Sequence, residues 1–571
     1  MAKKDYSKLE KDDLLKVIEK LESRKKYGLV WDEEKTKEQF EKESENALPV
    51  LKEVKGKEIK TDPSKPTNIL IEGDNYHALS VLNYTHQGKI DVIYIDPPYN
   101  TGNNSWKYNN QYVEKDDAYK HSKWLSFMSK RLKLAKNLLK DEGVLIATID
   151  DYEVHTLGLL ISEIFGEDNR MSTLIIESNP RGRTSDAFFA TSHEYYLYYA
   201  KNSSLVSFFN PALTEEQEEA FKLEDEISRY RLLPLRKSGA ASRKKDRPKQ
   251  FYPIYIRESD LSLSLTKFKE KCTEFWPIDE TGEERVWKLG TKTCAKLIES
   301  GDVVVSENKK NKYTLTQKDR IKAGRKPKTL WIDPKYDASA HGTILISTIL
   351  GKANVFDYPK SIYAVIDSLA VLLKEKKNAI VLDFFAGSGT TGHAVMQMNK
   401  NDGGERKFIL CTNNENGICE DVCYPRIKNV IKGYKNKKKK DIEGLENNLK
   451  YYKTAFVKNS ISRDDLKMRI TRECTEMLCL REGIFDEVKA KPDYHIFEQN
   501  GRIMGVYYSM ERDSLAQLKK ELDKMEGEKI LYCFTFDPLG LDKNDFADWQ
   551  GVSLEPIPQK ILDIYEQIYE Y

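Results

Sequence analysis

The stretch Asp91–Tyr99, Asp-Val-Ile-Tyr-Ile-Asp-Pro-Pro-Tyr, constrains the fold of this chain more than any other. Residues 92–95 form a short apolar run rich in β-branched side chains, which predicts a buried strand of a parallel sheet. The two prolines after Asp96 cannot continue a strand inside a sheet. An acid, a fixed corner and an aromatic residue therefore stand at the carboxyl end of a core strand, where doubly wound α/β folds bind their ligands.

The residues Asp96, Pro97, Pro98 and Tyr99 suit a planar ring that carries an exocyclic amine. The Asp96 carboxylate and the Pro97 carbonyl are acceptors for the two amine hydrogens, and Pro98 holds Pro97 extended and so aims its carbonyl. Tyr99 offers a ring for stacking. Two acceptors that favour a pyramidal nitrogen make the delocalised lone pair available. The motif resembles the Asp-Pro-Pro-Tyr signature of DNA amino-methyltransferases that act on adenine N6; the alternative is an ordinary strand-to-turn corner.

The length of 571 residues indicates about three or four domains, and the hydrophobic fraction of 39% can support sizeable cores. The formal net charge is only +2, so any surface for nucleic acid has to be local. The eight cysteines lack paired metal spacing, and we expect no metal site and reduced thiols in a cytoplasmic protein. Neither an apolar signal region nor a run of roughly 18 apolar residues occurs, so no membrane association is expected.

The domain order follows from where strands and helices alternate. That alternation stops near residue 205 and resumes at His341. A charge-rich stretch with helical periodicity precedes the alternating region, and a small α/β unit for dimer or partner contact follows that region. The expected domains are an N-terminal helical arm over 1–62, a first core part over 63–205, an inserted target-recognition domain over 206–340, a second core part over 341–435 and a C-terminal unit over 436–571.

A basic run lies in the insert, beside Phe251 and Tyr252. Clustered arginine and lysine next to aromatic residues is the pattern of phosphate contact with stacking, and a solvated charged face is the alternative. The neighbouring Asp-Pro-Pro-Tyr motif favours DNA. The candidate DNA-binding residues are Arg236, Lys237, Arg243, Lys244, Lys245 and Arg247.

A glycine loop follows another buried strand, residues 379–382, and opens a helix. Its glycines match G-x-G-x-x-G, which alone is a weak signal. A nicotinamide or flavin enzyme would bind a pyrophosphate there, whereas a methyltransferase would bind the methionine end of S-adenosylmethionine, its carboxylate favoured by the helix dipole. Only the second interpretation also explains Asp-Pro-Pro-Tyr. The candidate residues of the loop are Asp383, Phe385, Gly387, Ser388, Gly389 and Thr390, with Gly392 inside the helix.

Four acids stand at or near the ends of apolar strands: Asp74, Asp96, Asp383 and Glu415. In a parallel sheet these ends open on one edge, so the four side chains are expected to converge. We assign Glu415 to ribose hydroxyls, the Asp74–Asn75 turn to the cofactor's adenine and Asp383 to the ammonium of its methionine part.

The catalytic motif precedes the glycine loop by a long insert, and this order resembles the β-class of adenine-N6 DNA methyltransferases. More closely, the chain resembles the modification subunit of Type III restriction–modification systems. The matching motifs are Ile71–Asn75, Asp91–Asn100, Ser192–Tyr195, Arg247-Pro with Phe251–Ile254, Tyr358–Ser361 and Asp383–Gly392. Many relatives have a second proline where this chain has Ser361.

The resemblance implies a Rossmann-like, S-adenosylmethionine-dependent α/β core with permuted motif order that flips an adenine out of double-stranded DNA. It also implies that Lys360 borders the cofactor pocket, that the chain forms a homodimer and that a separate restriction subunit supplies helicase and nuclease activities. Other possibilities stay open: a nicotinamide- or nucleotide-binding enzyme, a silent DNA-recognition subunit, a cytosine-N4 or RNA methyltransferase, and an orphan or Type II enzyme.

Overall fold

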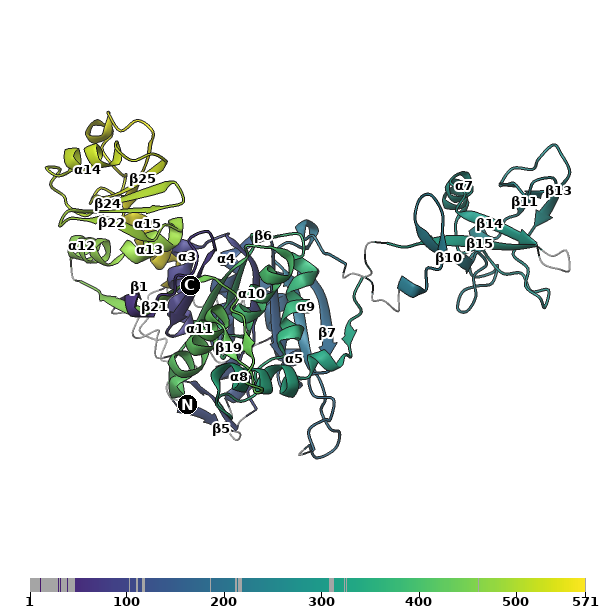
Figure 1. The fold of residues 1–571 in the computed structure, drawn as a ribbon, viewed down its shortest axis with the longest axis horizontal. Helices are drawn as coiled ribbons and strands as arrows, with labels where there is room; N and C mark the ends of the chain where they lie inside the picture. Colours follow the sequence, from purple (N-terminus) through teal and green to yellow (C-terminus); the bar gives the residue numbers. More distant parts are fainter. Residues whose placement is uncertain are drawn as a thin grey trace. The chain divides into compact units, whose positions relative to one another are not determined.

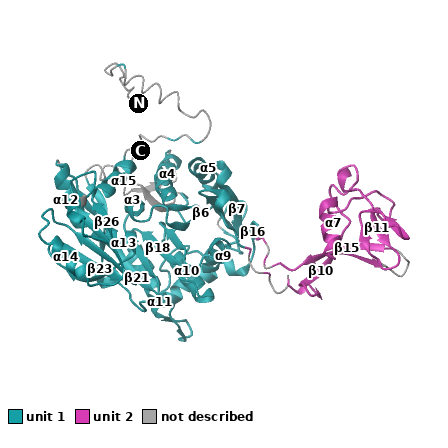
Figure 2. Ribbon diagram, turned by 90° about the horizontal axis from the view of Figure 1, so that it is seen from above, with its two compact units in different colours: residues 1–209, 328–571 teal, residues 210–327 magenta. Residues whose placement is uncertain are grey.

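The computed structural model describes most of the chain from residue 47 onward. The described residues are 47–101, 103–108, 111–114, 119–184, 186–210, 213, 218–307, 313–322, 324, 326–460 and 462–569, with the isolated positions 11, 29, 31 and 38 before them. The chain forms two compact units (Figure 2). Unit 1 contains Met1–Phe209 and Lys328–Tyr571, and unit 2 contains Asn210–Pro327.

A ten-stranded sheet forms the centre of unit 1. Its strands, in spatial order, are β1 (Ala47–Glu53), β21 (Asn448–Lys458), β2 (Thr67–Glu72), β18 (Lys407–Thr412), β17 (Ile380–Asp383), β3 (Ile90–Ile95), β6 (Leu139–Ile149), β8 (Glu194–Ala200), β7 (Arg170–Ile176) and β16 (Leu330–Trp331). Neighbouring strands are parallel except where β1 or β8 is one of the pair. The predicted parallel sheet is therefore mixed, with one antiparallel edge strand and one antiparallel interior strand.

Helices cover both faces of this sheet, which explains why its central strands are continuously apolar (Figure 1). All six residues of β3 are buried. One face carries α3 (Asn75–Thr85), α4 (Lys120–Leu138) and α5 (Val154–Phe165), and the other carries α8 (Ile344–Leu350), α9 (Ile362–Leu373), α10 (Thr390–Asp402) and α11 (Tyr424–Lys432). Two small hairpins, β4 (Asn103–Tyr108) with β5 (Gln111–Glu114) and β19 (Tyr434–Lys435) with β20 (Asp441–Ile442), lie outside the sheet.

The strand order reverses between β17 and β3, which pair in parallel. From β17 the chain passes through α10 to β18 on one side, and from β3 it passes through α4 to β6 on the other side. Such a reversal opens a crevice at the carboxyl ends of the two strands, and this is where open α/β sheets bind ligands.

The boundaries of the core differ from the expected ones in three places. Within the predicted helical arm, residues 47–53 form strand β1, whose Leu48, Val50 and Leu51 are buried. Strand β21 belongs to the central sheet although it lies in the segment assigned to the C-terminal unit, and β16 belongs to it although it lies in the predicted insert. Of the rest of the predicted arm, residues 54–62 contain the short 3₁₀ helix Lys55–Lys57, and residues 1–46 lie almost entirely outside the described residues.

The C-terminal part is an α/β subdomain that packs on the core. It contains a sheet of β22 (Asp486–Ala490), β23 (Tyr494–Gln499), β24 (Arg502–Tyr507), β25 (Glu528–Phe534) and β26 (Val552–Ile557), with α12 (Arg463–Glu473), α13 (Thr475–Glu482), α14 (Leu515–Leu522) and α15 (Gln559–Tyr569). Helices α13 and α15 lie against α3, and the Tyr565 hydroxyl donates a hydrogen bond to the Pro49 carbonyl. Because Leu478 and Ile561 belong to the same hydrophobic cluster as α3, the subdomain completes one face of the core.

The described part of unit 2 contains two small antiparallel sheets and the helix α7. One sheet contains β9 (Leu223–Glu224), β10 (Arg229–Pro234), β14 (Val303–Glu307) and β15 (Tyr313–Arg320), and the other contains β11 (Ile254–Arg257), β12 (Leu263–Ser264) and β13 (Cys272–Phe275). Leu235, Ile254, Trp287 and Cys294 of α7 (Thr291–Glu299) form its core. The unit thus has a hydrophobic centre of its own.

None of the described helices, in either unit, combines the length and the apolar character that crossing a bilayer requires.

Leu478→Ala tests whether the C-terminal subdomain is part of the core. Leu478 is fully buried, so its truncation is expected to lower the free energy of unfolding by about 2–5 kcal/mol, measured by denaturant titration. Leu539→Ala is the control, because this side chain is 96% exposed and its loss should change stability by less than about 0.5 kcal/mol. Equal stability of the two variants would contradict the shared core.

Candidate active site

Four adjacent parallel strands bring the four predicted acids to one edge of the sheet. Asp74 follows β2, Glu415 follows β18, Asp383 ends β17 and Asp96 follows β3. Asp383 and Asp96 lie on either side of the crevice where the strand order reverses. The glycine loop and the Asp-Pro-Pro-Tyr corner, far apart in sequence, are therefore neighbours.

The Asp96 carboxylate is held by two donors. Thr148 Oγ1, from β6, donates to Oδ1 at 2.5 Å, and Lys360 Nζ lies 3.0 Å from the same oxygen. Among the described residues no hydrogen bond reaches Oδ2, and the side chain is 29% exposed. The carboxylate is thus fixed in orientation and keeps acceptor capacity for a ligand.

The Lys360 ammonium is buried between two carboxylates and a phenol. It lies 2.7 Å from Glu194 Oε2 and donates to the Tyr99 hydroxyl, which in turn donates to Glu194 Oε2 at 3.1 Å. Burial alone would lower the pKa of Lys360, but the charges of Asp96 and Glu194 raise that pKa above its ordinary value. Lys360 therefore stays protonated and acts as a fixed cation rather than a base.

The contacts of Lys360 are with the catalytic motif. The family resemblance implied that Lys360 borders the cofactor pocket, and among the described residues its side-chain partners are Asp96, Tyr99 and Glu194. The cofactor role of Lys360 thus remains a prediction, while its contact with Asp96 is an observation.

Glu194 is a site residue that sequence reasoning missed, as is Thr148. Glu194 begins β8 and its Oε1 accepts a 3.5 Å hydrogen bond from the buried Tyr196 hydroxyl, which itself accepts from Tyr94 at 3.3 Å. Its signal was the motif Ser192–Tyr195, which carried the family resemblance without a role for the acid. Burial, with the charges of Asp96 and Glu194, holds the pKa of Tyr99 well above its usual range, so the phenol stays neutral.

The Pro-Pro corner is fixed by its neighbours. Trp124 Nε1 donates to the Pro98 carbonyl at 2.7 Å, and no described residue donates to the Pro97 carbonyl, the second predicted acceptor. Asn100, directly after Tyr99, donates to the fully buried Glu153 at 2.6 Å. The corner is therefore fixed at Pro98 and Asn100, and the role of the Pro97 carbonyl as the second acceptor remains a prediction.

The glycine loop has the backbone that its sequence predicts. Gly387 and Gly389 have φ of +49° and +78°, in the left-handed region that side chains other than glycine rarely adopt. Gly392 packs α10 closely, since a Cβ there would lie 2.9 Å from Ile427 Cδ1 and 3.0 Å from Leu410 Cδ1. Gly387 and Gly389 thus bring main chain without a Cβ atom to the edge of the crevice.

Asp383 is a buried carboxyl at the start of this loop. Its Oδ2 accepts from Thr391 Oγ1 at 2.5 Å and its Oδ1 accepts from the Phe385 N–H at 3.0 Å. Burial raises the pKa of Asp383 to about 7, because these hydrogen bonds only partly offset the loss of solvation. A cationic ligand would complete the site by supplying the missing positive charge.

The Asp74–Asn75 turn is joined to the glycine loop. Asn75 Nδ2 donates to the Phe384 carbonyl at 3.0 Å and Asn75 Oδ1 accepts from Arg131 Nε at 2.5 Å. Asp74 accepts from the Tyr76 N–H at 2.8 Å as the N-cap of α3 and lies 3.4 Å from Arg131 Nη2. These contacts fix the turn beside the loop. Between the ends of β2 and β17, at the end of β18, Glu415 begins a short 3₁₀ turn, Glu415–Gly417.

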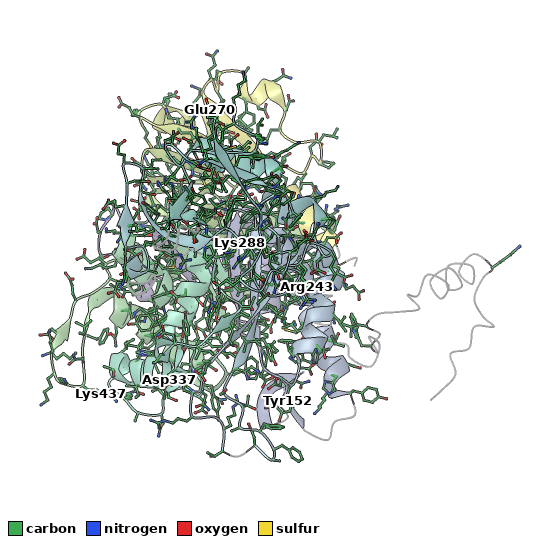
Figure 3. All side chains as sticks on the ribbon, turned by 90° about the vertical axis from the view of Figure 1, so that its right-hand side faces the viewer. Tyr152, Arg243, Glu270, Lys288, Asp337 and Lys437 are labelled. Carbon is green, nitrogen blue, oxygen red and sulfur yellow. The ribbon has the colours of Figure 1, made fainter. Side chains whose placement is uncertain are left out.

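The basic run of unit 2, of which Arg243 is labelled in Figure 3, is divided into paired and exposed residues. Arg243 and Lys244 form ion pairs with Glu283 at 2.7 Å and Glu284 at 2.9 Å. Arg236 donates to the Ile278 carbonyl at 2.7 Å. Lys245 and Arg247 are exposed and form no ion pair with any described residue, while Lys237 is half-buried. The charge available for phosphate is smaller than the sequence predicts.

Within the described parts of both units, no group of three or more His, Cys, Asp and Glu side chains has the arrangement of a metal site. The eight cysteines are free thiols.

Comparison with known proteins identifies the class. The doubly wound sheet, the glycine loop and the Asp-Pro-Pro-Tyr corner are those of an S-adenosylmethionine-dependent amino-methyltransferase, and the α/β fold with permuted motif order is as predicted. The sequence profile of the DNA methylase family, the N6 and N4 methyltransferases, matches residues 90–456, and the chain belongs to this family.

Individual relatives agree with the predicted resemblance to Type III modification subunits, which is confirmed. The Type III restriction-modification enzyme EcoPI Mod subunit of Escherichia phage P1 is 34% identical over 380 residues, 61% of this chain and 58% of that protein. The Type II methyltransferase M.KpnI of Klebsiella pneumoniae is 36% identical over 348 residues, 60% of this chain and 79% of that protein. The chain thus spans somewhat more than half of the phage relative.

Among solved structures, the M1.HpyAVI–SAM complex covers 63% of this chain at 13% identity, with a TM-score of 0.28. A likeness of this extent supports no comparison of individual residues.

The raised pKa of Asp383 predicts how stability depends on pH. Since the folded pKa, about 7, exceeds the unfolded value of about 3.8, the unfolded chain binds fewer protons between these values, and stability falls as pH rises through them. Asp383→Asn removes this loss, which amounts to about 1.4 kcal/mol per pH unit. The variant should therefore raise the thermal midpoint of the cofactor-free chain more at about pH 8.5 than at about pH 5.

Asp548→Asn is the control for this measurement, because its side chain is 74% exposed. Equal gains from Asp383→Asn at both pH values would show that Asp383 is ionised in the folded chain without a cation.

Proposed function

We propose that this chain transfers a methyl group from S-adenosylmethionine to N6 of an adenine in double-stranded DNA, as the modification subunit of a Type III restriction–modification system. The observation that carries this proposal is the Asp96–Tyr99 corner, fixed across one crevice from the glycine loop. Membership of the DNA methylase family supports the reaction. Three relatives that are Type III Mod subunits support the system.

The cofactor would bind at the glycine loop. The left-handed glycines let its methionine part approach the main chain, and the Asp383 carboxylate would pair with its ammonium. Phe385, Ser388 and Thr390 line the same loop, Asp74 and Asn75 lie on one side of it, and Glu415 lies at the next strand end for the ribose hydroxyls. Bound there, S-adenosylmethionine would supply a methyl group on its sulfonium sulfur, and this sulfur would leave as a neutral thioether.

The target adenine would bind at the corner. The carboxylate of Asp96 and the carbonyl of Pro97 accept the two N6 hydrogens, and the nitrogen lone pair is then directed at the methyl group. As N6 gains the methyl group it loses one proton, for which the Asp96 carboxylate is the contacting acceptor; Lys360, already protonated, cannot take it. Much of the acceleration would come from this positioning.

Base flipping is part of this proposal, because N6 cannot reach the corner from within the duplex. Extrusion costs a few kcal/mol, and stacking on the Tyr99 ring offsets about 1–3 kcal/mol of it. The Tyr99 hydroxyl is tied to Glu194 and Lys360, so its ring is oriented before the base arrives.

A homodimer and a separate restriction subunit belong to the same proposal, which places the protein in the cytoplasm with its DNA. A Type II enzyme is the second candidate, because the chain covers a larger share of M.KpnI than of the phage Mod subunit. Methylation of one strand of a short asymmetric site favours the Type III subunit. Methylation of both strands of a palindrome favours the Type II enzyme.

Asp96→Ala tests the reaction. We expect methyl transfer to plasmid DNA to fall at least about 100-fold, since the main acceptor for N6 is lost, while calorimetric binding of S-adenosylmethionine changes little. Asp548→Ala is the control for loss of a carboxylate. Single-molecule sequencing of the product by the wild-type chain identifies the modified base and its site. Normal methylation by Asp96→Ala, or a wild-type chain that binds cofactor and modifies no DNA, would contradict the proposal.

Lys245→Ala/Arg247→Ala tests the DNA surface of unit 2. If both side chains contact phosphates, the slope of log affinity against log salt falls by about 2, because each phosphate contact contributes about 0.9. Lys267→Ala/Lys269→Ala is the matched control, since both lysines are exposed in the same unit outside the basic run. Equal slopes for the two double variants would place the phosphate contacts elsewhere.

A further inference from the structure

The segment between β7 and β8, residues 177–193, projects from the active-site edge, and we call it the Phe loop. Strand β7 is antiparallel to β8, as β6 is, so β7 runs in the same direction as β6 and β3. The loop therefore leaves the sheet at the end that carries Asp96, and it returns directly to Glu194. Figure 1 shows it extending beyond the body of unit 1 below β7.

Internal hydrogen bonds and close packing hold the Phe loop in a defined conformation. Backbone hydrogen bonds join Asn179 to Ser192 and Arg183 to Thr191, each at 3.0 Å. The Asp186 carboxylate accepts from the Thr191 N–H at 2.9 Å. Gly182 has φ of +68° and packs so closely that a Cβ there would lie 2.7 Å from Ala190 Cβ. These contacts hold the two sides of the loop together up to its tip.

The tip presents two adjacent aromatic side chains to solvent. Phe188 is 95% exposed and Phe189 is 91% exposed. Single exposed apolar residues are common, but two neighbouring phenylalanines exposed to this extent on a hydrogen-bonded loop indicate a contact surface. No other adjacent pair of aromatic residues among the described positions is exposed in this way.

The loop carries two exposed cations. Arg181 and Arg183 are exposed, while Glu177 at the base of the loop is half-buried and the Asp186 carboxylate accepts a hydrogen bond within the loop. Burial raises the pKa of Asp150 to about 6, and the nearby charges of Arg183 and Lys360 both act to lower it. The charges of Arg183 and Lys360 thus both act on Asp150, which follows strand β6.

We propose that Phe188 and Phe189 enter the DNA duplex beside the target adenine and occupy the space that the flipped base leaves, with Arg181 and Arg183 against the flanking phosphates. Apolar side chains that enter a duplex between base steps unstack it locally, and extrusion of a base requires such unstacking. The loop is suited to this role because its far end is continuous with Glu194, which orients Tyr99. The inference rests on the proposed function, and it names the segment that opens the duplex.

Phe188→Ala/Phe189→Ala in the full-length chain tests the inference, on a duplex that contains the site found by sequencing. We expect the single-turnover methylation rate to fall about tenfold or more, because the stacking that replaces the flipped base is lost. On a duplex whose target adenine faces an abasic position, the rate of the variant should return toward that of the wild type, because the adenine is already unpaired. Phe188→Leu/Phe189→Leu should retain part of the rate on the paired duplex.

Leu539→Ala is the control for loss of an exposed apolar side chain and should methylate both duplexes like the wild type. A wild-type chain that methylates no DNA overturns the proposed function and this inference with it. Wild-type rates for the Phe188→Ala/Phe189→Ala variant overturn the inference alone. Loss of rate on both duplexes also overturns the inference, because the loop would then support the fold or a contact with a second copy of the chain. Size-exclusion chromatography distinguishes these two roles.

Discussion

The buried Lys360 ammonium is the interaction on which the active site depends. It joins three segments that are distant in the sequence: the corner after β3, the start of β8 and the core that resumes after unit 2. Removing one member of such a buried charged set leaves the others uncompensated, at a cost of about 3–5 kcal/mol. The two halves of the core, which the insert separates, are thus tied together where Asp96 and Tyr99 have to be oriented.

The permuted order of motifs is compatible with this site because strand pairing, and not the position of a strand in the sequence, sets the order of strands in the sheet. Strand β17 enters between β18 and β3, after the whole of unit 2 has been passed, and it restores the reversal of strand order that a ligand site requires. The insertion at residues 210–327 leaves and re-enters unit 1 near β8 and β16, at one side of the sheet. The insertion therefore does not interrupt the central strands that carry the four acids.

Local patterns explain what the sequence could predict. The strands that precede Asp74, Asp96 and Asp383 are short apolar runs because both faces of the sheet are covered, so these strand ends were evident. Strands β1 and β21 were missed because they lie at the sheet margin, where charged residues such as Lys450 and Glu53 pair with each other. Whether these site residues act as assigned remains a prediction.

Contacts between distant residues could not be predicted in the same way. Nothing local indicates that Glu283 and Glu284 neutralise Arg243 and Lys244, so the basic run overstates the charge available to DNA. Likewise, two adjacent phenylalanines in a sequence are ordinarily core residues, and only the structure shows Phe188 and Phe189 at the surface.

The charges at the crevice favour a cationic cofactor over the phosphates of DNA. Asp74, Asp96, Asp383, Glu194 and Glu415 lie along one edge of the sheet, which attracts a cationic cofactor but repels phosphates. Lys360, engaged with Asp96 and Glu194, does not reverse this balance. If the proposed function holds, cations outside the crevice would hold the phosphate backbone, and the candidates are those of the Phe loop and those of unit 2. Under the proposed function, an acidic crevice would admit a neutral flipped base while it repels the phosphates of the strand from which the base came.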